Sequence, residues 1–147
     1  MNEAIRAVMD LARDELFRNR VTLRTEFADD LSPVLGDRVQ LQQVILNLVM
    51  NGVEAMSTVE EGRRELVIRT QNDEADQVRV IVGDSGIGLD PQGMERIFDA
   101  FFTTKPAGMG MGLSISRSIV QSHGGRLWAV ANDGVGTTFH FTVLKHH

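Results

Sequence analysis

The segment Asp37–Ser57 most constrains the fold, because it has the length of a helix and is apolar almost all the way round. Residues about 100° apart around a helix place on one broad face Leu41, Val44, Ile45, Leu48, Val49, Gly52, Ala55 and Met56. A helix this apolar is expected to be buried, so other elements of the chain must cover it. Asp37 is the expected N-cap, since its side chain can accept from a free backbone N–H.

One narrow stripe of the same helix is polar and consists of Gln40, Gln43, Asn47, Asn51 and Glu54. Asn47 and Asn51 are four residues apart, so their amides project the same way. Asn is a poor helix former, and two of them in a buried helix need a reason. One interpretation is a solvated stripe. The other is a pair of carbonyl oxygens directed at Mg²⁺, which prefers oxygen ligands and keeps waters and substrate phosphates.

Helical and strand patterns alternate along the rest of the chain. Further helices are expected at 2–19, near 92–98 and at 112–122, and strands at 21–27, 65–70, 77–82, 126–131 and 136–144. An acidic turn at Asn72–Glu74 predicts a hairpin between the second and third strands. This succession predicts an α/β sandwich, with a mixed sheet and helices covering one face.

Composition excludes several classes of protein. A length of 147 residues suits one domain, which we place at residues 1–145, with His146 and His147 interpreted as the remnant of a purification tag. The chain has no Cys and therefore no thiolate site. A net charge of −5 argues against nucleic-acid binding. The sequence shows no apolar run long enough for a membrane span, so we expect a soluble, cytoplasmic domain.

A first glycine loop, Gly83-Asp84-Ser85-Gly86-Ile87-Gly88, follows the strand at 77–82. Gly86 and Gly88 permit unusual backbone conformations and let a ligand approach the main chain. A buried Asp84 carboxylate can accept a hydrogen bond from the exocyclic amine of adenine, and it would reject guanine. An ordinary tight turn is the alternative, because Asp, Ser and Gly are all turn residues.

A second glycine loop, 107–114, opens the helix expected at 112–122. Its glycines, which include Gly110 and Gly112, expose backbone N–H groups at the positive end of a helix dipole, a place that favours phosphate. The spacing fits neither the Rossmann nor the Walker A pattern. Lys105, just upstream, is a candidate cation for phosphate oxygens. A flexible hinge is the alternative interpretation.

Between the glycine loops lie Phe98, Phe101 and Phe102, followed by Thr103-Thr104-Lys105. These aromatics indicate either a small satellite core under a long loop or the anchors of a lid, at about 89–110, that moves over a ligand. A last segment, Gly134-Val135-Gly136-Thr137-Thr138-Phe139, reads as a hairpin turn that leads into a strand and presents Thr hydroxyls.

Taken together, five segments resemble the N, G1, F, G2 and G3 boxes of the catalytic ATP-binding domain of bacterial sensor histidine kinases. In chain order they are N-x-x-x-N-G-x-E-A-M, D-S-G-I-G-L, F-D-A-F-F-T-T-K, G-M-G-M-G-L-S-I-S and G-V-G-T-T-F. The resemblance covers almost the whole chain and extends to the wider Bergerat-fold ATPases. It implies a mostly antiparallel sheet, helices on one face and a mobile ATP lid. The short lid is similar to PAS-linked kinases of the nitrogen-fixation and nitrogen-regulation type.

The resemblance assigns ATP and Mg²⁺ to named residues. Asn51 matches the Mg²⁺-binding Asn, Asn47 the Asn near the phosphates, Asp84 the adenine-reading Asp, and Thr137 the Thr that reaches adenine with it. Chaperone and topoisomerase relatives hold a water-activating Glu at the place of Asn47, and an Asn cannot act as that base. Lys105 matches a lid position that often carries a cation.

The glycine boxes are assigned by the same resemblance. Gly86 and Gly88 match the glycines that line the base pocket, whereas Gly110, Gly112 and Leu113 match the backbone that cradles phosphate. The chain departs from many relatives at Glu54-Ala55, where they carry a Lys/Arg-Tyr pair, so we assign no stacking or cationic role to this place.

A complete kinase also carries a phosphoacceptor His in a His-Glu/Asp-x-x-x-Pro helix, and this chain contains no such motif. His123 and His140 lack that context and are interpreted as structural. We therefore expect an excised domain, or part of a longer protein whose acceptor helices lie elsewhere. The isolated domain is expected to be monomeric and to bind nucleotide without autophosphorylation. Its expected partners are the dimerisation helices of a homodimeric parent and, indirectly, a response regulator. Two alternatives stay open: an ATP-hydrolysing or serine-kinase enzyme of the same fold, and a nucleotide-free docking module.

Overall fold

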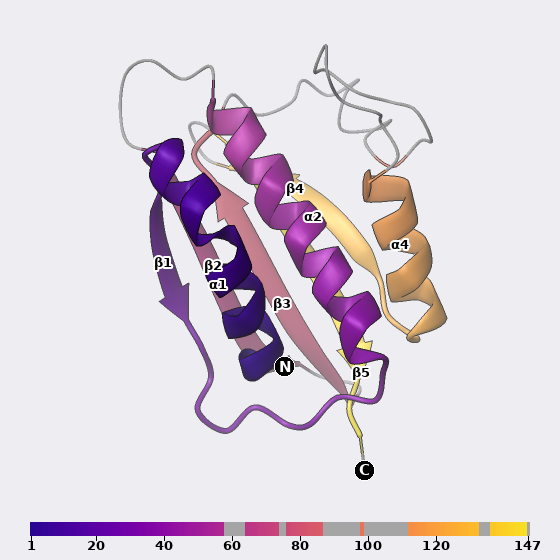
Figure 1. Ribbon diagram of the computed structural model, residues 1–147. Helices are drawn as coiled ribbons and strands as arrows, with labels where there is room; N and C mark the ends of the chain where they lie inside the picture. Colours follow the sequence, from indigo (N-terminus) through magenta and orange to yellow (C-terminus); the bar gives the residue numbers. More distant parts are fainter. Residues whose placement is uncertain (58–63, 74–75, 87–97, 99–111, 133–135, 147) are drawn as a thin grey trace.

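The computed structural model describes residues 1–57, 64–73, 76–86, 98, 112–132 and 136–146. In this part of the chain, three helices cover one face of a five-stranded sheet (Figure 1). The elements are α1 (Asn2–Arg18), β1 (Thr22–Glu26), α2 (Arg38–Met56), β2 (Glu65–Asp73), β3 (Gln77–Asp84), α4 (Gly112–Ser122), β4 (Leu127–Ala131) and β5 (Thr137–Leu144).

The sheet has the strand order β1-β2-β3-β5-β4. β1 pairs with β2 in parallel, and the other three pairings are antiparallel. The expected mixed, mostly antiparallel sheet with helices on one face is therefore confirmed. Among the described residues, none of the helices is long and apolar enough to cross a membrane.

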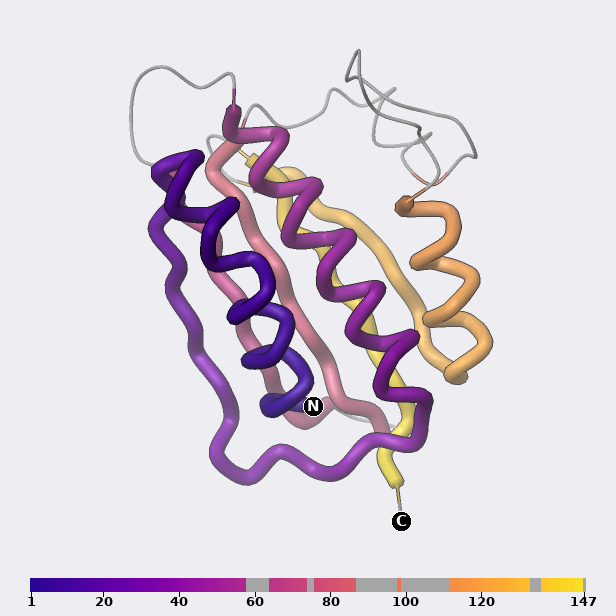
Figure 2. The backbone as a smooth tube through the Cα atoms, viewed as in Figure 1, coloured from indigo at the N-terminus to yellow at the C-terminus, as the bar shows by residue number. Residues whose placement is uncertain are grey.

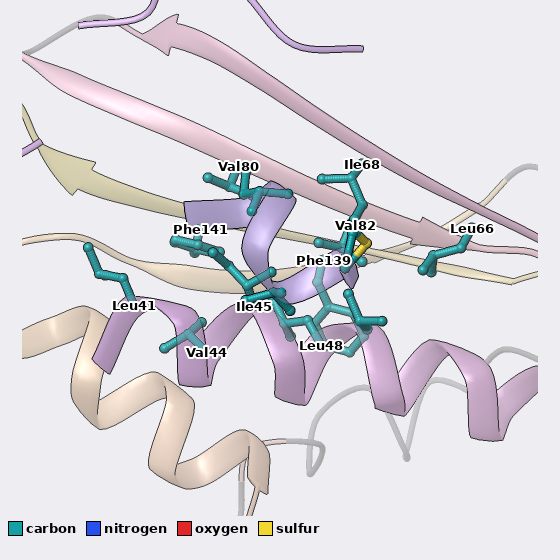
Figure 3. Packing of buried hydrophobic residues seen from close by; sticks show 14 of the residues in the cluster. Leu41, Val44, Ile45, Leu48, Leu66, Ile68, Val80, Val82, Phe139 and Phe141 are labelled. Atoms are coloured by element: carbon teal, nitrogen blue, oxygen red, sulfur yellow. The ribbon is translucent and has the colours of Figure 1, made fainter. Parts of the chain in front are cut away.

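α2 is the middle helix of its layer and runs between α1 and α4 (Figure 2). The expected N-cap forms: the Asp37 Oδ1 accepts from the Gln40 backbone N–H at 3.0 Å. The apolar face of α2 packs against the sheet and forms with it a hydrophobic core (Figure 3). This core includes Leu41, Val44, Ile45, Leu48, Leu66, Ile68, Val80, Val82, Phe139 and Phe141. Each such side chain contributes about 1.5–3 kcal/mol on burial, so this layer contact is the main stabilising feature of the fold.

The hairpin strands run further than the sequence pattern indicated. β2 continues to Asp73 and β3 to Asp84, with a register that extends from Leu66↔Asp84 to Asp73↔Gln77. The expected hairpin is confirmed, but Asn72 and Asp73, which were expected in its turn, are the last two residues of β2. Asn72 is a strand residue because its side chain is used elsewhere: it donates to the Asp30 carbonyl and accepts from the Ser32 N–H, both at 3.0 Å. Tertiary pairing outweighs its low strand propensity.

The sheet face opposite the helices carries an aromatic and cationic cluster. Trp128 and His140 are cross-strand partners whose rings stack 5.1 Å apart at 3°. The Arg126 and Arg79 guanidinium groups lie 4.8 and 5.1 Å from the Trp128 ring centroid. Within the described residues, the buried His140 Nδ1 has no hydrogen-bond partner. Burial, and then the neighbouring Arg79 charge, lowers the pKa of His140 below its usual 6.5.

Replacing His140 by Phe is expected to flatten the dependence of thermal stability on pH. In the wild type, the contribution of His140 to stability is fully present above pH 6.5. It is lost as the pH falls through the lowered folded-state pKa, because the unfolded chain binds a proton there and the folded chain does not. His140→Phe keeps the ring on Trp128 and removes the unpaired nitrogen. Tm scans from about pH 7.5 to about pH 5 test this: equal slopes in the two proteins would contradict it.

Candidate functional site

The site is built around Asp84, at the end of β3, where its side chain is buried with 5% exposure. The Asp84 Oδ1 accepts a hydrogen bond from the Gly86 N–H at 2.8 Å. A Cβ added at Gly52 of α2 would lie 3.3 Å from the Asp84 Cβ and 3.7 Å from its Oδ2. The carboxyl group therefore lies against the side of α2, with one oxygen oriented by the loop that follows it.

Gly86 brings this loop against the last turn of α2. A Cβ at Gly86 would lie 2.7 Å from the Ala55 carbonyl oxygen and 2.8 Å from the Ala55 Cβ. Among the described glycines, only Gly124 and Gly136 have a positive φ. Close approach to the helix, and not unusual backbone freedom, is thus what requires glycine at position 86. Ala55 is the residue of α2 against which this loop packs. The neighbouring Glu54 is exposed.

The end of the β4–β5 hairpin meets Asp84 from the other side. The last pair of the β3–β5 ladder is Gly83↔Thr138, so Asp84 and Thr137, each one residue further, share a sheet face. Thr137 is buried, with 4% exposure. The expected meeting of Asp84 and Thr137 is thus consistent with the register of the sheet.

A further residue, Asn132, joins this group and has no counterpart in the sequence analysis. Its Nδ2 donates to the Asp84 carbonyl at 2.9 Å, and its Oδ1 accepts from the Thr138 hydroxyl. Asn132 therefore ties the backbone of Asp84 to the beginning of β5. No local signal in the sequence marks a contact across 48 residues.

Asn47 connects α2 with the beginning of α4. Its Nδ2 donates to the Ser116 Oγ at 3.0 Å and to the Gly112 carbonyl at 3.4 Å. The half-buried Asn51 lies one turn further along α2. The two Asn residues are thus not simply a solvated stripe, although Gln40, Gln43 and Glu54 of the same stripe are exposed.

α4 begins at Gly112 and ends in a glycine cap. Leu113 packs against the hydrophobic core, which brings the amino end of α4 beside Asn47. Gly124 has a φ of 75°, and the Gly125 N–H donates to the Val120 carbonyl at 3.1 Å. The site as described gathers around the carboxyl-terminal half of α2, with Asp84 and Thr137 on one side and the start of α4 on the other.

Several predicted site residues lie outside the described residues: Gly88, Lys105 and Gly110, together with Phe101 and Phe102, most of the short helix expected near 92–98 and, apart from Phe98, the lid expected at 89–110. Phe98 is described. It packs edge-on against Phe139, with ring centroids 6.4 Å apart at 83°, and the Arg117 guanidinium lies 5.6 Å from its centroid. This contact is compatible with both interpretations of the aromatics, a small satellite core and the anchor of a lid.

The chemistry of the donor set suits a divalent ion held mainly by its substrate. In the described ranges, no three His, Cys, Asp or Glu residues come together as a metal-binding group. Mg²⁺ is usually bound by one or two protein oxygens together with waters and substrate phosphates. The amide oxygens of Asn47 and Asn51 are compatible with that mode of binding.

Comparison with known proteins identifies the family. Residues 36–147 match the family described as "Histidine kinase-, DNA gyrase B-, and HSP90-like ATPase". The chain belongs to this family. This ATPase domain is 47% identical to the sensor protein FixL of Bradyrhizobium diazoefficiens over 123 residues. The aligned region covers 84% of the chain and 24% of FixL. It is 34% identical to the histidine-protein kinase AtoS of Escherichia coli over 139 residues. That aligned region covers 95% of the chain and 22% of AtoS.

Solved structures agree with the assignment. The nucleotide-free catalytic domain of histidine kinase ThkA superposes with a TM-score of 0.85 at 35% identity, covering 99% of the chain and 92% of that structure. Full-length ShkA in complex with AMPPNP gives 0.83 at 26% identity, covering 96% of the chain and 29% of ShkA. The ATPase domain is therefore of the catalytic type found in sensor histidine kinases. It spans about a quarter of the length of the curated relatives FixL and AtoS.

Proposed function

We propose that this ATPase domain binds Mg-ATP and donates the γ-phosphoryl group to a histidine on the dimerisation helices of a parent sensor kinase. The observation that carries the proposal is the buried Asp84, oriented by the Gly86 N–H and next to the buried Thr137. A carboxylate can accept several hydrogen bonds. A purine amine is a suitable partner for it.

The same geometry supports selection of adenine. The Asp84 Oδ1 is engaged by the Gly86 N–H, and its carboxylate accepts hydrogen bonds only. The exocyclic amine of adenine donates, whereas guanine presents a carbonyl at the corresponding place. The site is therefore expected to favour adenine nucleotides, with Thr137 as the second polar contact and Gly86 and Gly88 along the base.

The phosphate end is assigned to the other side of α2. Asn47 and Asn51 offer amide oxygens, and the start of α4, with Gly110, Gly112 and Leu113, offers backbone N–H groups that favour anions. Lys105 would add a positive charge. When bound, Mg²⁺ would neutralise negative charge on the phosphate oxygens. An amide at position 47 cannot deprotonate water, so the residues here position ATP without promoting its hydrolysis.

In the proposed transfer, the bond between the γ-phosphorus and the bridging oxygen breaks, a phosphorus–nitrogen bond forms on a neutral histidine, and ADP leaves. The proton of that histidine goes to a base on the acceptor helices, outside this chain. The ThkA kinase has been solved in complex with the response regulator protein TrrA. We infer by analogy that a homodimeric parent of this domain, located in the cytoplasm or anchored to the membrane, passes phosphate to a response regulator.

The isolated domain is expected to bind Mg-ADP and Mg-ATP yet to incorporate no phosphate. Calorimetric titration at tens of micromolar protein measures binding, and γ-labelled ATP followed by an acid- and alkali-stability test measures phosphohistidine. Stoichiometric labelling of this chain alone would contradict the expectation. Steady release of inorganic phosphate would favour the hydrolase, and the absence of any binding heat would favour a nucleotide-free docking module.

A further inference from the structure

Ser116 is a buried polar residue at the contact between α4 and α2. α4 has two fully buried side chains, Ser116 and Val120, both at 0% exposure. A hydroxyl group in such a place costs free energy unless it is hydrogen-bonded, and an apolar residue would serve a purely packing role at least as well. The Ser116 hydroxyl therefore needs a hydrogen-bond partner, and a polar residue at this place needs a functional explanation.

The partner is Asn47. The Ser116 Oγ accepts from the Asn47 Nδ2 at 3.0 Å, and the Gly112 carbonyl is 3.4 Å from the same nitrogen. A backbone carbonyl only accepts, so the amide atom that faces Gly112 must be the nitrogen. Its two hydrogens are then both directed at α4, and the amide oxygen is turned away from these two acceptors.

We propose that Ser116 is a positioning residue, which holds the Asn47 carboxamide so that its oxygen is presented to the phosphates or the bound ion. This inference rests on the proposed function, in which Asn47 serves the phosphate end. The contact to Gly112 is long for a hydrogen bond and does not hold the amide alone. Ser116 also couples α4 to α2, because the Asn47 nitrogen of α2 contacts Ser116 and Gly112 of α4.

The orientation is tested first without nucleotide. In the ¹⁵N-labelled chain, the two hydrogens of the Asn47 side-chain NH₂ are expected to give separate resonances and to exchange slowly with water. Ser116→Ala is expected to speed this exchange by about three- to tenfold, corresponding to the loss of one net hydrogen bond. The control is Ser118→Ala, the same change at an exposed position of α4, which leaves the exchange unchanged. Equal exchange in the wild type and Ser116→Ala would overturn the inference.

The second test is the affinity for Mg-ADP, measured by calorimetry. Ser116→Ala is expected to weaken binding about three- to tenfold, and Ser118→Ala to leave it unchanged. Because Ser116 acts through Asn47, the double variant Ser116→Ala/Asn47→Ala should bind no more weakly than Asn47→Ala alone. Additive losses would show an independent, structural role and would overturn the inference.

Ser116→Cys separates hydrogen bonding from packing and covers the case in which Ser116→Ala is unstable. It fills nearly the same space with a much weaker acceptor, so binding should again fall while Tm stays near that of the wild type. Wild-type affinity in Ser116→Cys would overturn the inference. A wild-type chain that binds no Mg-ADP at all would instead refute the proposed function, and the nucleotide-free exchange measurement would still report on the orientation of Asn47.

Discussion

Asp84→Asn is expected to weaken the binding of adenine nucleotides by about 1–3 kcal/mol, roughly 5- to 150-fold. The Gly86 N–H needs an acceptor, so the Asn side chain must keep its oxygen at the place of Oδ1. Its NH₂ group then takes the place of Oδ2. At that place the amide N–H of the variant would face the exocyclic amine N–H of adenine. Repulsion between two donors would then replace the hydrogen bond.

The same variant is expected to discriminate less between purines. An NH₂ group at the Oδ2 position can donate to the guanine carbonyl that the wild-type carboxylate repels. Calorimetric titration with Mg-ADP and Mg-GDP measures both effects. The matched control is Asp73→Asn, the same change at the opposite end of the β2–β3 hairpin, where the carboxylate pairs with Arg79 at 2.7 Å. If Asp84→Asn binds both nucleotides as the wild type does, the assignment of the base site is wrong.

Gly136→Ala is expected to reduce stability and nucleotide affinity together. Gly136 has a φ of 98°, and an added Cβ would lie 2.0 Å from the Asp84 carbonyl oxygen and 2.8 Å from the Asn132 Nδ2. The positive φ alone costs about 1–3 kcal/mol for a residue with a side chain. Relief of the clash must displace the backbone of Asp84 or break its hydrogen bond with Asn132, so the base site is distorted as well.

Thermal unfolding and Mg-ADP titration measure these two losses, and we expect Tm to fall by about 5 °C or more. Gly112→Ala is the steric control for stability, because, among the described residues, no atom would lie closer to its Cβ than the Asn47 Cγ at 3.8 Å. It should keep the wild-type Tm. An unchanged Tm in Gly136→Ala would show that the turn before β5 has room for a side chain, contrary to the structure.

The candidate site was predictable from the sequence only in part. The buried Asp84 and Thr137, the half-buried Asn47 and Asn51, and Gly112 and Leu113 at the start of α4 lie in the elements where the motifs placed them. Glycine at position 86 was noted for backbone freedom, whereas the structure explains it by contact with Ala55. Close approach of two segments depends on their packing, and a single sequence contains no local sign of it.

Asn132 and Ser116 were not identified from the sequence for the same reason. Asn132 acts on Asp84, 48 residues away, and Ser116 acts on Asn47, 69 residues away. In sequence, Asn132 is a polar residue near a predicted turn, and Ser116 is one of several polar positions in a short helix. Their roles exist only once β4 lies beside β5 and α4 lies against α2.

The local chemistry of the sequence determined the apolar face of α2, its Asp37 cap, the glycine cap of α4 and the alternation of strands with helices. These features depend on side-chain periodicity and on hydrogen bonds between near neighbours. Only the tertiary structure decided the parallel pairing of β1 with β2, the place of β5 between β3 and β4, and the contacts that orient Asp84 and Asn47. Those depend on which distant surfaces bury each other best, a free-energy difference summed over the whole core.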